Sequence, residues 1–246
     1  MTIAHWVVGD GQATVLVHAG VADARMWAPQ VEELKADHQV ITVDLRGYGE
    51  TPLAPAYSDA GDLLAVLDEL GIDRVTAVGS SYGGYVVQQA ASVAPQRFER
   101  LVLICAPTDN VEPDEELRAV WAEESRLLDA LDVDGATELI VRKWMGPEAD
   151  DEARELLRTM QRRAYELQLA AGDVDNEEYS VEPDKISAPV RLITGARDFR
   201  FFTDCADYLA DRLPNAERIV LPWAGHLPTL ERPAEALALI RRDQVD

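Results

Sequence analysis

The sequence is poor in cysteine and contains no long apolar run. Its two cysteines, Cys105 and Cys205, are too few for a disulfide framework and lack C-x-x-C spacing, so we expect two buried thiols, no metal site and no cofactor. No stretch approaches the roughly 20 apolar residues of a membrane span. The first residues also lack the basic and apolar regions of a signal peptide. These absences favour a cytoplasmic protein that does not insert into membranes.

Positive charge is also scarce. The chain has 23 lysines and arginines against 45 aspartates and glutamates, a formal net charge of -22. Such a charge repels nucleic acids and anionic membrane surfaces, so we expect neither as a partner. With 47% hydrophobic residues, the 246-residue chain has the composition of a globular protein and the length of one α/β domain with an insertion. We expect a small-molecule substrate, and a monomer or a homodimer.

Short apolar runs alternate with segments of helical periodicity over most of the chain. This order predicts an α/β fold with a mostly parallel sheet of about seven strands and helices on both faces. The first two strands flank Gly9-Asp10-Gly11, which is typical of a hairpin turn. The predicted strands are Ile3–Val8, Thr14–Val17, Val40–Leu45, Val75–Val78, Leu101–Cys105, Val190–Thr194 and Arg218–Leu221. The predicted helices are Trp27–Asp37, Ser58–Leu70, the segment between Ser81 and Pro95, and Pro233–Arg241.

The alternation stops after Pro107. From about Asp109 to Pro183 there is no strand signal, and an all-helical block inside such an alternation is most simply an excursion over one end of the sheet. We therefore divide the chain into a core, residues 1–108 and 184–246, and an inserted helical cap, residues 109–183. The helical stretches predicted in the cap are Pro113–Leu131, Gly135–Trp144 and Asp151–Ala171.

A serine at a strand-to-helix junction is the centre of the predicted site. Gly79 and Gly83 bracket Ser81 in a G-x-S-x-G pattern, which is typical of a nucleophile elbow. The missing side chains allow a sharp turn that exposes the serine at the carboxyl end of its strand, where open α/β sheets bind ligands. The pattern alone is weak, because a glycine-rich turn with a solvated serine has the same spacing. The prediction depends on finding the partners of a triad.

The chain has only four histidines, and one of them has the position of a general base. A serine hydroxyl needs a base within hydrogen-bond reach, usually a histidine held by a carboxylate. His226 follows the last predicted strand, at the same sheet edge as Ser81. We expect structural or solvent-facing roles for His5 and His38, and a hydrogen-bonded, loop-shaping role for His18.

The third member of the triad should follow a strand that lies between the serine and the histidine in the sequence. Asp198 follows the strand Val190–Thr194 and is the first candidate, whereas Asp109 follows an earlier strand and remains the alternative. With Asp198, the order along the chain is Ser, Asp, His, which is the order expected for an elbow of this kind.

Five motifs carry a resemblance that covers nearly the whole chain. They are His18-Ala19-Gly20, Asp44-Leu45-Arg46-Gly47-Tyr48-Gly49, Gly79-Ser80-Ser81-Tyr82-Gly83-Gly84, Gly195-Ala196-Arg197-Asp198 and Gly225-His226. Together they are similar to those of capped serine hydrolases of the α/β-hydrolase superfamily, among them esterases and enol-lactonases. The resemblance implies an oxyanion hole made by the backbone N–H groups of Tyr82 and Gly20, with Val21 as a substitute for Gly20. The family's usual His-Gly pair is His18-Ala19 here.

The resemblance implies hydrolysis of a carboxylic ester or lactone of a small, mostly apolar molecule through an acyl-enzyme on Ser81. The same triad also serves carbon-carbon bond hydrolases and aminopeptidases, and the fold also supports non-catalytic ligand binding, so these remain alternatives. We expect the cap to supply much of the substrate pocket. The candidate wall residues, for each of which ordinary packing is an equal alternative, are Met26, Trp121, Trp144, Met145, Met160, Tyr165 and Trp223.

Overall fold

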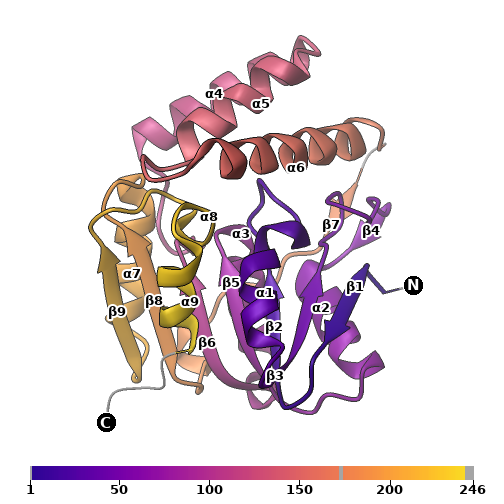
Figure 1. Cartoon of the computed structure of the whole chain (residues 1–246), viewed down its shortest axis with the longest axis vertical. Helices are drawn as coiled ribbons and strands as arrows, with labels where there is room; N and C mark the ends of the chain where they lie inside the picture. Colours follow the sequence, from indigo (N-terminus) through magenta and orange to yellow (C-terminus); the bar gives the residue numbers. More distant parts are fainter. Residues whose placement is uncertain (1, 172–173, 242–246) are drawn as a thin grey trace.

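The computed structural model describes residues 2–171 and 174–241, and within these ranges a seven-stranded sheet forms the centre of the molecule (Figure 1). The strand order is β1-β3-β2-β5-β6-β8-β9, and all neighbours are parallel except β1 and β3. The predicted mostly parallel sheet of about seven strands is therefore confirmed. The strands are β1 (His5–Val8), β2 (Gln12–Val17), β3 (His38–Val43), β5 (Val75–Ser80), β6 (Phe98–Ile104), β8 (Val190–Gly195) and β9 (Ala216–Leu221).

The predicted hairpin between the first two strands is wrong. β1 pairs antiparallel with β3, with Trp6 opposite Thr42, whereas β2 pairs parallel with the other side of β3. The connection between β1 and β2 crosses the start of β3. A Cβ on Gly9, in this connection, would lie 2.3 Å from the His38 carbonyl oxygen. Burial explains this order. β2 is buried over its last four residues and takes a central place, while the more exposed β1 takes the edge.

Helices cover both faces of the sheet, as predicted. Leu63 and Leu209 belong to an apolar cluster under α2, α3 and α7, while Leu34 and Ile240 belong to another cluster under α1 and α9. The helices α7 and α8 lie in a segment for which no helix was predicted. The bounds are α1 (Ala28–Leu34), α2 (Asp59–Glu69), α3 (Tyr82–Val93), α7 (Arg200–Ala210), α8 (Pro228–Glu231) and α9 (Pro233–Arg241).

Three helices between β6 and β8 lie above one end of the sheet, at the top of Figure 1. They are α4 (Glu115–Asp129), α5 (Val133–Trp144) and α6 (Asp151–Leu169). Each begins after an aspartate, Asp114, Asp132 or Asp150, whose carboxylate accepts a backbone N–H of the first turn. These caps explain why the helices start close to the predicted positions. Among the described helices, none is long and apolar enough to cross a membrane.

The chain returns from α6 to the core through a short strand that the sequence did not reveal. β7 (Asp175–Asn176) pairs in parallel with β4 (Ala56–Tyr57). The expectation that residues 109–183 contain no strand is therefore wrong at this point. A two-residue strand has too few positions to show a period of two, so no sequence pattern could have indicated it.

Candidate active site

Ser81 occupies a strained turn between β5 and α3. Its backbone has φ 49° and ψ -120°, a conformation that non-glycine residues rarely adopt. The turn is possible because its neighbours are glycines: a Cβ on Gly79 would lie 2.5 Å from the Gly83 carbonyl oxygen. A Cβ on Gly83 would lie 2.4 Å from the carbonyl oxygens of Val17 and His18. Close backbone packing thus positions the serine hydroxyl.

The structure brings Ser81, His226 and Asp198 into one chain of hydrogen bonds. The distance from His226 Nε2 to Ser81 Oγ is 2.7 Å, and the distance from His226 Nδ1 to Asp198 Oδ2 is 2.8 Å. The side chains of His226 and Asp198 are each only 1% exposed. The other carboxylate oxygen of Asp198 accepts the Phe199 N–H at 2.7 Å. Asp198 is therefore fixed on one side by the backbone and on the other by the imidazole.

Asp109, the alternative acid, is placed differently. It is exposed, and its carboxylate accepts the Val181 N–H at 3.1 Å and a hydrogen bond from the Asn110 amide at 2.7 Å. Both partners lie on the segments that lead into and out of the helical insertion. The carboxylate that contacts His226 is that of Asp198.

The proposed oxyanion donors lie beside Ser81. Tyr82 is the first residue of α3, so its N–H has no helical partner. Gly20 packs against it, because a Cβ on Gly20 would lie 3.1 Å from Tyr82 Cβ. In the described part of the chain, no acceptor is found for the N–H groups of Tyr82, Gly20 or Val21. The geometry leaves both Gly20 and Val21 available as the second donor.

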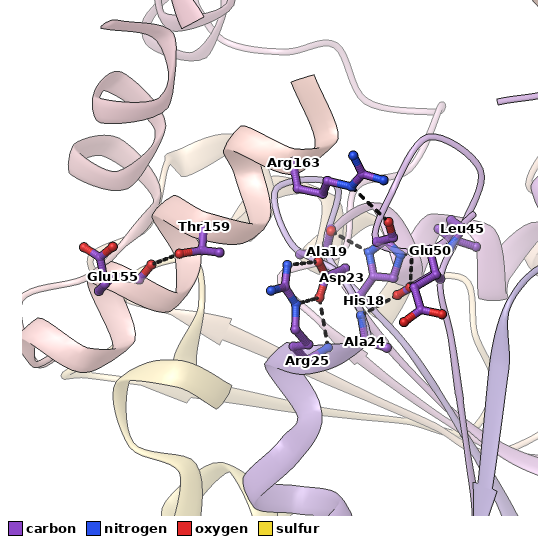
Figure 2. A network of polar contacts seen from close by, with 12 residues as sticks. His18, Ala19, Asp23, Ala24, Arg25, Leu45, Glu50, Glu155, Thr159 and Arg163 are labelled. Atoms are coloured by element: carbon purple, nitrogen blue, oxygen red, sulfur yellow. Dashed lines mark hydrogen bonds and ion pairs between the residues drawn. The ribbon is translucent and has the colours of Figure 1, made fainter. Parts of the chain in front are cut away.

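His18 lies in the loop that carries Gly20, and Figure 2 shows its ring beside Ala19. Its Nδ1 lies 2.8 Å from the Ala19 carbonyl oxygen, and its Nε2 accepts the Leu45 N–H at 2.9 Å. Because Nε2 accepts an N–H, the ring carries its proton on Nδ1, and burial favours this uncharged form by lowering the pKa of the imidazole. The expected loop-shaping role of His18 agrees with these contacts.

Asp44 fixes the adjoining turn. Its two carboxylate oxygens accept the Ala24 and Glu50 N–H groups, each at 2.8 Å. A Cβ on Gly49 would overlap this carboxylate, at 1.9 Å from Oδ2. The motif around Asp44 therefore holds together the loops beside the site and does not reach Ser81 through any contact that the structure shows.

Aromatic rings cover the imidazole of His226. The ring centroid of Trp144, at the end of α5, lies 4.5 Å from it, and that of Phe202, on α7, lies 4.1 Å from it. Phe199 contacts Trp144 at 5.1 Å. Phe199 and Phe202 were not predicted as site residues, because α7 was not predicted. Its apolar positions Phe202, Cys205 and Leu209 recur at helical spacing and were the available signal.

The candidate wall residues have different surroundings. The ring of Trp144 packs against that of His226, and its buried indole N–H has no partner among the described residues. Trp121 is exposed on α4, and Trp223 is partly buried beneath the Arg232 guanidinium. The remaining candidates, Met26, Met145, Met160 and Tyr165, are buried in the apolar cluster that also contains Trp144.

Glu231 connects the histidine loop to the helical insertion, and the sequence did not single it out. Its two carboxylate oxygens accept the Gly225 N–H at 2.9 and 3.2 Å. Burial raises the pKa of this carboxyl, while the N–H groups of Gly225 and Gly146 oppose the rise. Gly146 follows α5 and Gly225 precedes His226. One carboxylate therefore holds the end of α5 against the loop that carries the imidazole.

A cavity of about 750 Å³ lies away from the triad, between α5 and α6 and the loops drawn in Figure 2. It is lined by charged side chains, among them Asp23, Arg25, Arg158 and Arg163, and no triad residue lines it. Arg25 is paired with Asp23 through Nε at 2.9 Å and Nη2 at 2.6 Å. The cavity is therefore a polar groove between the insertion and the core.

The geometry defines what the site can do chemically. A buried carboxylate that accepts from an imidazole, with the imidazole in contact with a serine hydroxyl, is the arrangement that removes the serine proton during attack on a carbonyl. Free N–H groups at a helix start can stabilise the negative charge that then develops on oxygen.

Comparison with known proteins agrees with this architecture. A family model described as "Alpha/beta hydrolase family" matches residues 14–239. A RutD protein of Pseudomonas savastanoi pv. phaseolicola, assigned as a carbamate hydrolase, is 29% identical over 91% of this chain and 90% of its own. A pimeloyl-(acyl-carrier protein) methyl ester esterase of Nitrosomonas europaea is 28% identical over 92% of this chain and 93% of its own.

A solved structure shows the same fold. A thermophilic esterase from Thermogutta terrifontis superposes with a TM-score of 0.81 and 26% identity, covering 97% of this chain and 91% of the esterase. The family match extends over more than nine tenths of the sequence, from β2 to α9. The chain therefore belongs to the alpha/beta hydrolase family and is a hydrolase.

Proposed function

We propose that the protein is a serine hydrolase that cleaves a carboxylic ester or lactone of a small, mostly apolar molecule through an acyl-enzyme on Ser81. The observation that carries the proposal is the pair of contacts at His226, 2.7 Å to Ser81 Oγ and 2.8 Å to Asp198 Oδ2. The relatives support an ester substrate, since one is a methyl ester esterase and a structural neighbour is an esterase.

The reaction begins when Ser81 Oγ attacks the substrate carbonyl. His226 Nε2 takes the hydroxyl proton, and Asp198 holds the imidazole in the required tautomer and stabilises its cation. The N–H groups of Tyr82 and of Gly20 or Val21 receive the oxyanion. The intermediate collapses, His226 gives the proton to the leaving group, and an acyl-enzyme remains. A water molecule, deprotonated by His226, then releases the acid and restores the serine.

The helical insertion, residues 109–183, acts in this proposal as a cap that closes the acyl site. Its α5 presents Trp144 to His226, and Phe202 from the core completes an apolar cover over the imidazole. Such a cover excludes water from the transition state and favours apolar substituents near the carbonyl. The buried N–H of Trp144, which has no protein acceptor among the described residues, is a donor for a substrate oxygen.

A carbamate is the second candidate substrate, because the 29% identical RutD protein is assigned as a carbamate hydrolase. The triad would act on a carbamate carbonyl by the same steps. The two candidates differ in the leaving group or acyl substituent and therefore in the pocket, not in Ser81, His226 or Asp198.

Hydrolysis assays test the proposal. We expect turnover of 4-nitrophenyl acetate or butyrate, or of a small lactone, and a loss of at least about 10³-fold in Ser81→Ala. The matched control is Ser80→Ala, which removes a neighbouring buried hydroxyl that makes no hydrogen bond with the described residues. Equal turnover by Ser81→Ala and the parent would contradict the proposal. Absence of turnover with any ester, lactone or carbamate, with ligand binding retained, would favour a non-catalytic binding protein.

A further inference from the structure

A second cavity, of about 290 Å³, lies next to the proposed oxyanion donors. Three tyrosines, Tyr48, Tyr57 and Tyr82, line it together with Asp59 and Arg46. We call it the tyrosine pocket. It is formed by the loop after β3, by β4 and by the first residues of α2 and α3, with Gln168 from α6 at its rim.

The tyrosine pocket is close to the reacting atoms. Tyr82 directly follows Ser81 and supplies one of the proposed oxyanion donors. A Cβ on Gly20 would lie 3.5 Å from the Tyr48 hydroxyl and 3.1 Å from Tyr82 Cβ, so the tyrosines pack against the loop that carries the other donor. The pocket therefore borders both the loop and the helix start that carry the proposed donors.

Asp59 is the acidic group of the tyrosine pocket. Its residue is 4% exposed, and its Oδ2 accepts the Tyr82 hydroxyl at 2.7 Å. Its Oδ1 is buried and accepts no hydrogen bond of good geometry from the described residues, although the Arg46 N–H and the Asn176 amide lie close enough to the carboxylate to lower its pKa. A buried acceptor without a well-aligned donor is costly, so a donor brought by a ligand would stabilise this oxygen.

The positive group of the tyrosine pocket is already neutralised. Arg46 donates to Asp62 from Nε at 2.6 Å and from Nη2 at 3.0 Å, and its guanidinium lies 5.8 Å from the Tyr57 ring centroid. Arg46 is thus paired with Asp62, and among the described residues that line the pocket the acidic side chain is that of Asp59. The pocket therefore favours a cation or another hydrogen-bond donor over an anion.

We propose that the tyrosine pocket binds a protonated amino group at the non-reacting end of the substrate, with Asp59 as its ionic partner. The inference rests on the proposed function in taking Ser81 as the reacting group. Tyrosine faces attract an ammonium ion through their π electrons, and an ammonium supplies three donors. The net charge of -22 also attracts cationic ligands at long range.

Matched esters test the substrate preference. The substrates are 4-nitrophenyl esters of ω-amino acids with six to ten carbons, each compared with the methyl-ended ester of equal length. For at least one length, we expect kcat/KM of the amino ester to exceed that of the methyl-ended ester by at least about tenfold. Asp59→Asn, which keeps the shape of the side chain, should reduce this ratio to about one. Asp129→Asn, a change of the same charge on an exposed residue of α4, should leave the ratio unchanged.

A second variant covers the case in which Asp59→Asn does not fold. Tyr57→Leu removes one π face from a partly buried position and should lower the preference for the amino ester several-fold. The inference is wrong if the amino and methyl-ended esters are hydrolysed equally at every length, or if Asp59→Asn keeps the full preference.

Binding without turnover separates this inference from the proposed function. In Ser81→Ala, n-butylammonium should shift the amide NMR signals around Asp59 and Tyr82, and 1-butanol at equal concentration should not. Adding Asp59→Asn should abolish the shifts. If esters are not hydrolysed but butylammonium binding depends on Asp59, the proposed function is wrong and the assignment of the pocket as an ammonium site is supported. If esters are hydrolysed but butylammonium does not bind, the pocket assignment fails alone.

Discussion

Two regions of the molecule are stabilised by different kinds of packing: the carboxyl end of the sheet, which carries Ser81, and the helical insertion above it. At the sheet edge, backbone approaches backbone: a Cβ on Gly195 would lie 2.1 Å from the Gly225 carbonyl oxygen, and one on Gly83 would meet two carbonyl oxygens. In the insertion, amphipathic helices pack by apolar faces and carry exposed ion pairs such as Arg162 with Asp134. The difference teaches that backbone geometry around Ser81 tolerates few substitutions, whereas the amphipathic helices of the insertion tolerate many; in our proposal these helices determine selectivity.

The largest expected effect is at the triad. Asp198→Asn should lower kcat by about 10⁴-fold with little loss of stability, because the amide favours the wrong imidazole tautomer. Steady-state kinetics and thermal unfolding measure the two quantities. Asp109→Asn is the control, since Asp109 is an exposed acid bonded to Val181. A comparable loss of kcat in Asp109→Asn, with none in Asp198→Asn, would reverse the assignment of the acid.

Substitution of Gly83 should show how little space remains for a side chain at the carboxyl end of the sheet. Gly83→Ala should lower the free energy of unfolding by about 3 kcal/mol or more, since its Cβ would lie 2.4 Å from two backbone oxygens. Gly71→Ala offers the contrast: no atom lies within 4 Å of its Cβ, and only the positive φ of 66° opposes it. That change should cost about 1 kcal/mol. Chemical denaturation of both variants makes the comparison, and equal losses would contradict the steric account.

Asp59 should make stability depend on pH. Burial raises the pKa of its carboxyl to about 6, while the Tyr82 hydroxyl opposes the rise and Asp62 adds to it. The folded state thus holds the proton more tightly than the unfolded state, whose pKa is near 3.8. Stability from this group is full below pH 4 and is lost as pH rises through about 6.

Asp59→Asn removes this titration. Between pH 4 and pH 7, the parent should lose up to about 3 kcal/mol relative to Asp59→Asn. Denaturant unfolding at several pH values measures the difference, with the nearby charges of Arg46 and Asp62 unchanged in both proteins. A stability difference that stays constant over this pH range would show that Asp59 has an ordinary pKa.

The smallest effect tests the insertion. Trp144→Phe should change kcat/KM by about tenfold and alter the ranking of acyl groups, because the indole that covers His226 is replaced by a smaller ring without an N–H. Trp121→Phe, on the exposed part of α4, should change neither. A substrate ranking that is identical in the parent and Trp144→Phe would place selectivity outside this ring.

The sequence predicted the central strands and the helices of the insertion well, because their apolar and helical patterns are local signals. It failed for β1, whose place at the sheet edge depends on the burial of β2 and not on the turn between them. It also missed α7, and with it Phe202, although the apolar spacing of that helix was present. Contacts between residues distant in the sequence were the feature that the sequence predicted least well.

Asp59 and Glu231 illustrate that limit. Their importance comes from partners distant in the sequence, such as Tyr82 for Asp59 and Gly146 for Glu231. In a chain with 45 acidic residues, no local pattern distinguishes these two carboxylates from solvated ones. By contrast, glycine spacing and chain order are local signals, and they allowed Ser81 and His226 to be predicted as partners that the structure places 2.7 Å apart.

Covalent labelling tests the central claim most directly. A fluorophosphonate reacts only with an activated hydroxyl, and the hydrogen bond of 2.7 Å between His226 and Ser81 predicts such activation. Mass spectrometry of the digested adduct should locate a single label on Ser81, and Ser81→Ala should take up none while Ser80→Ala is labelled like the parent. A label on another residue, or equal labelling of Ser81→Ala, would contradict the account.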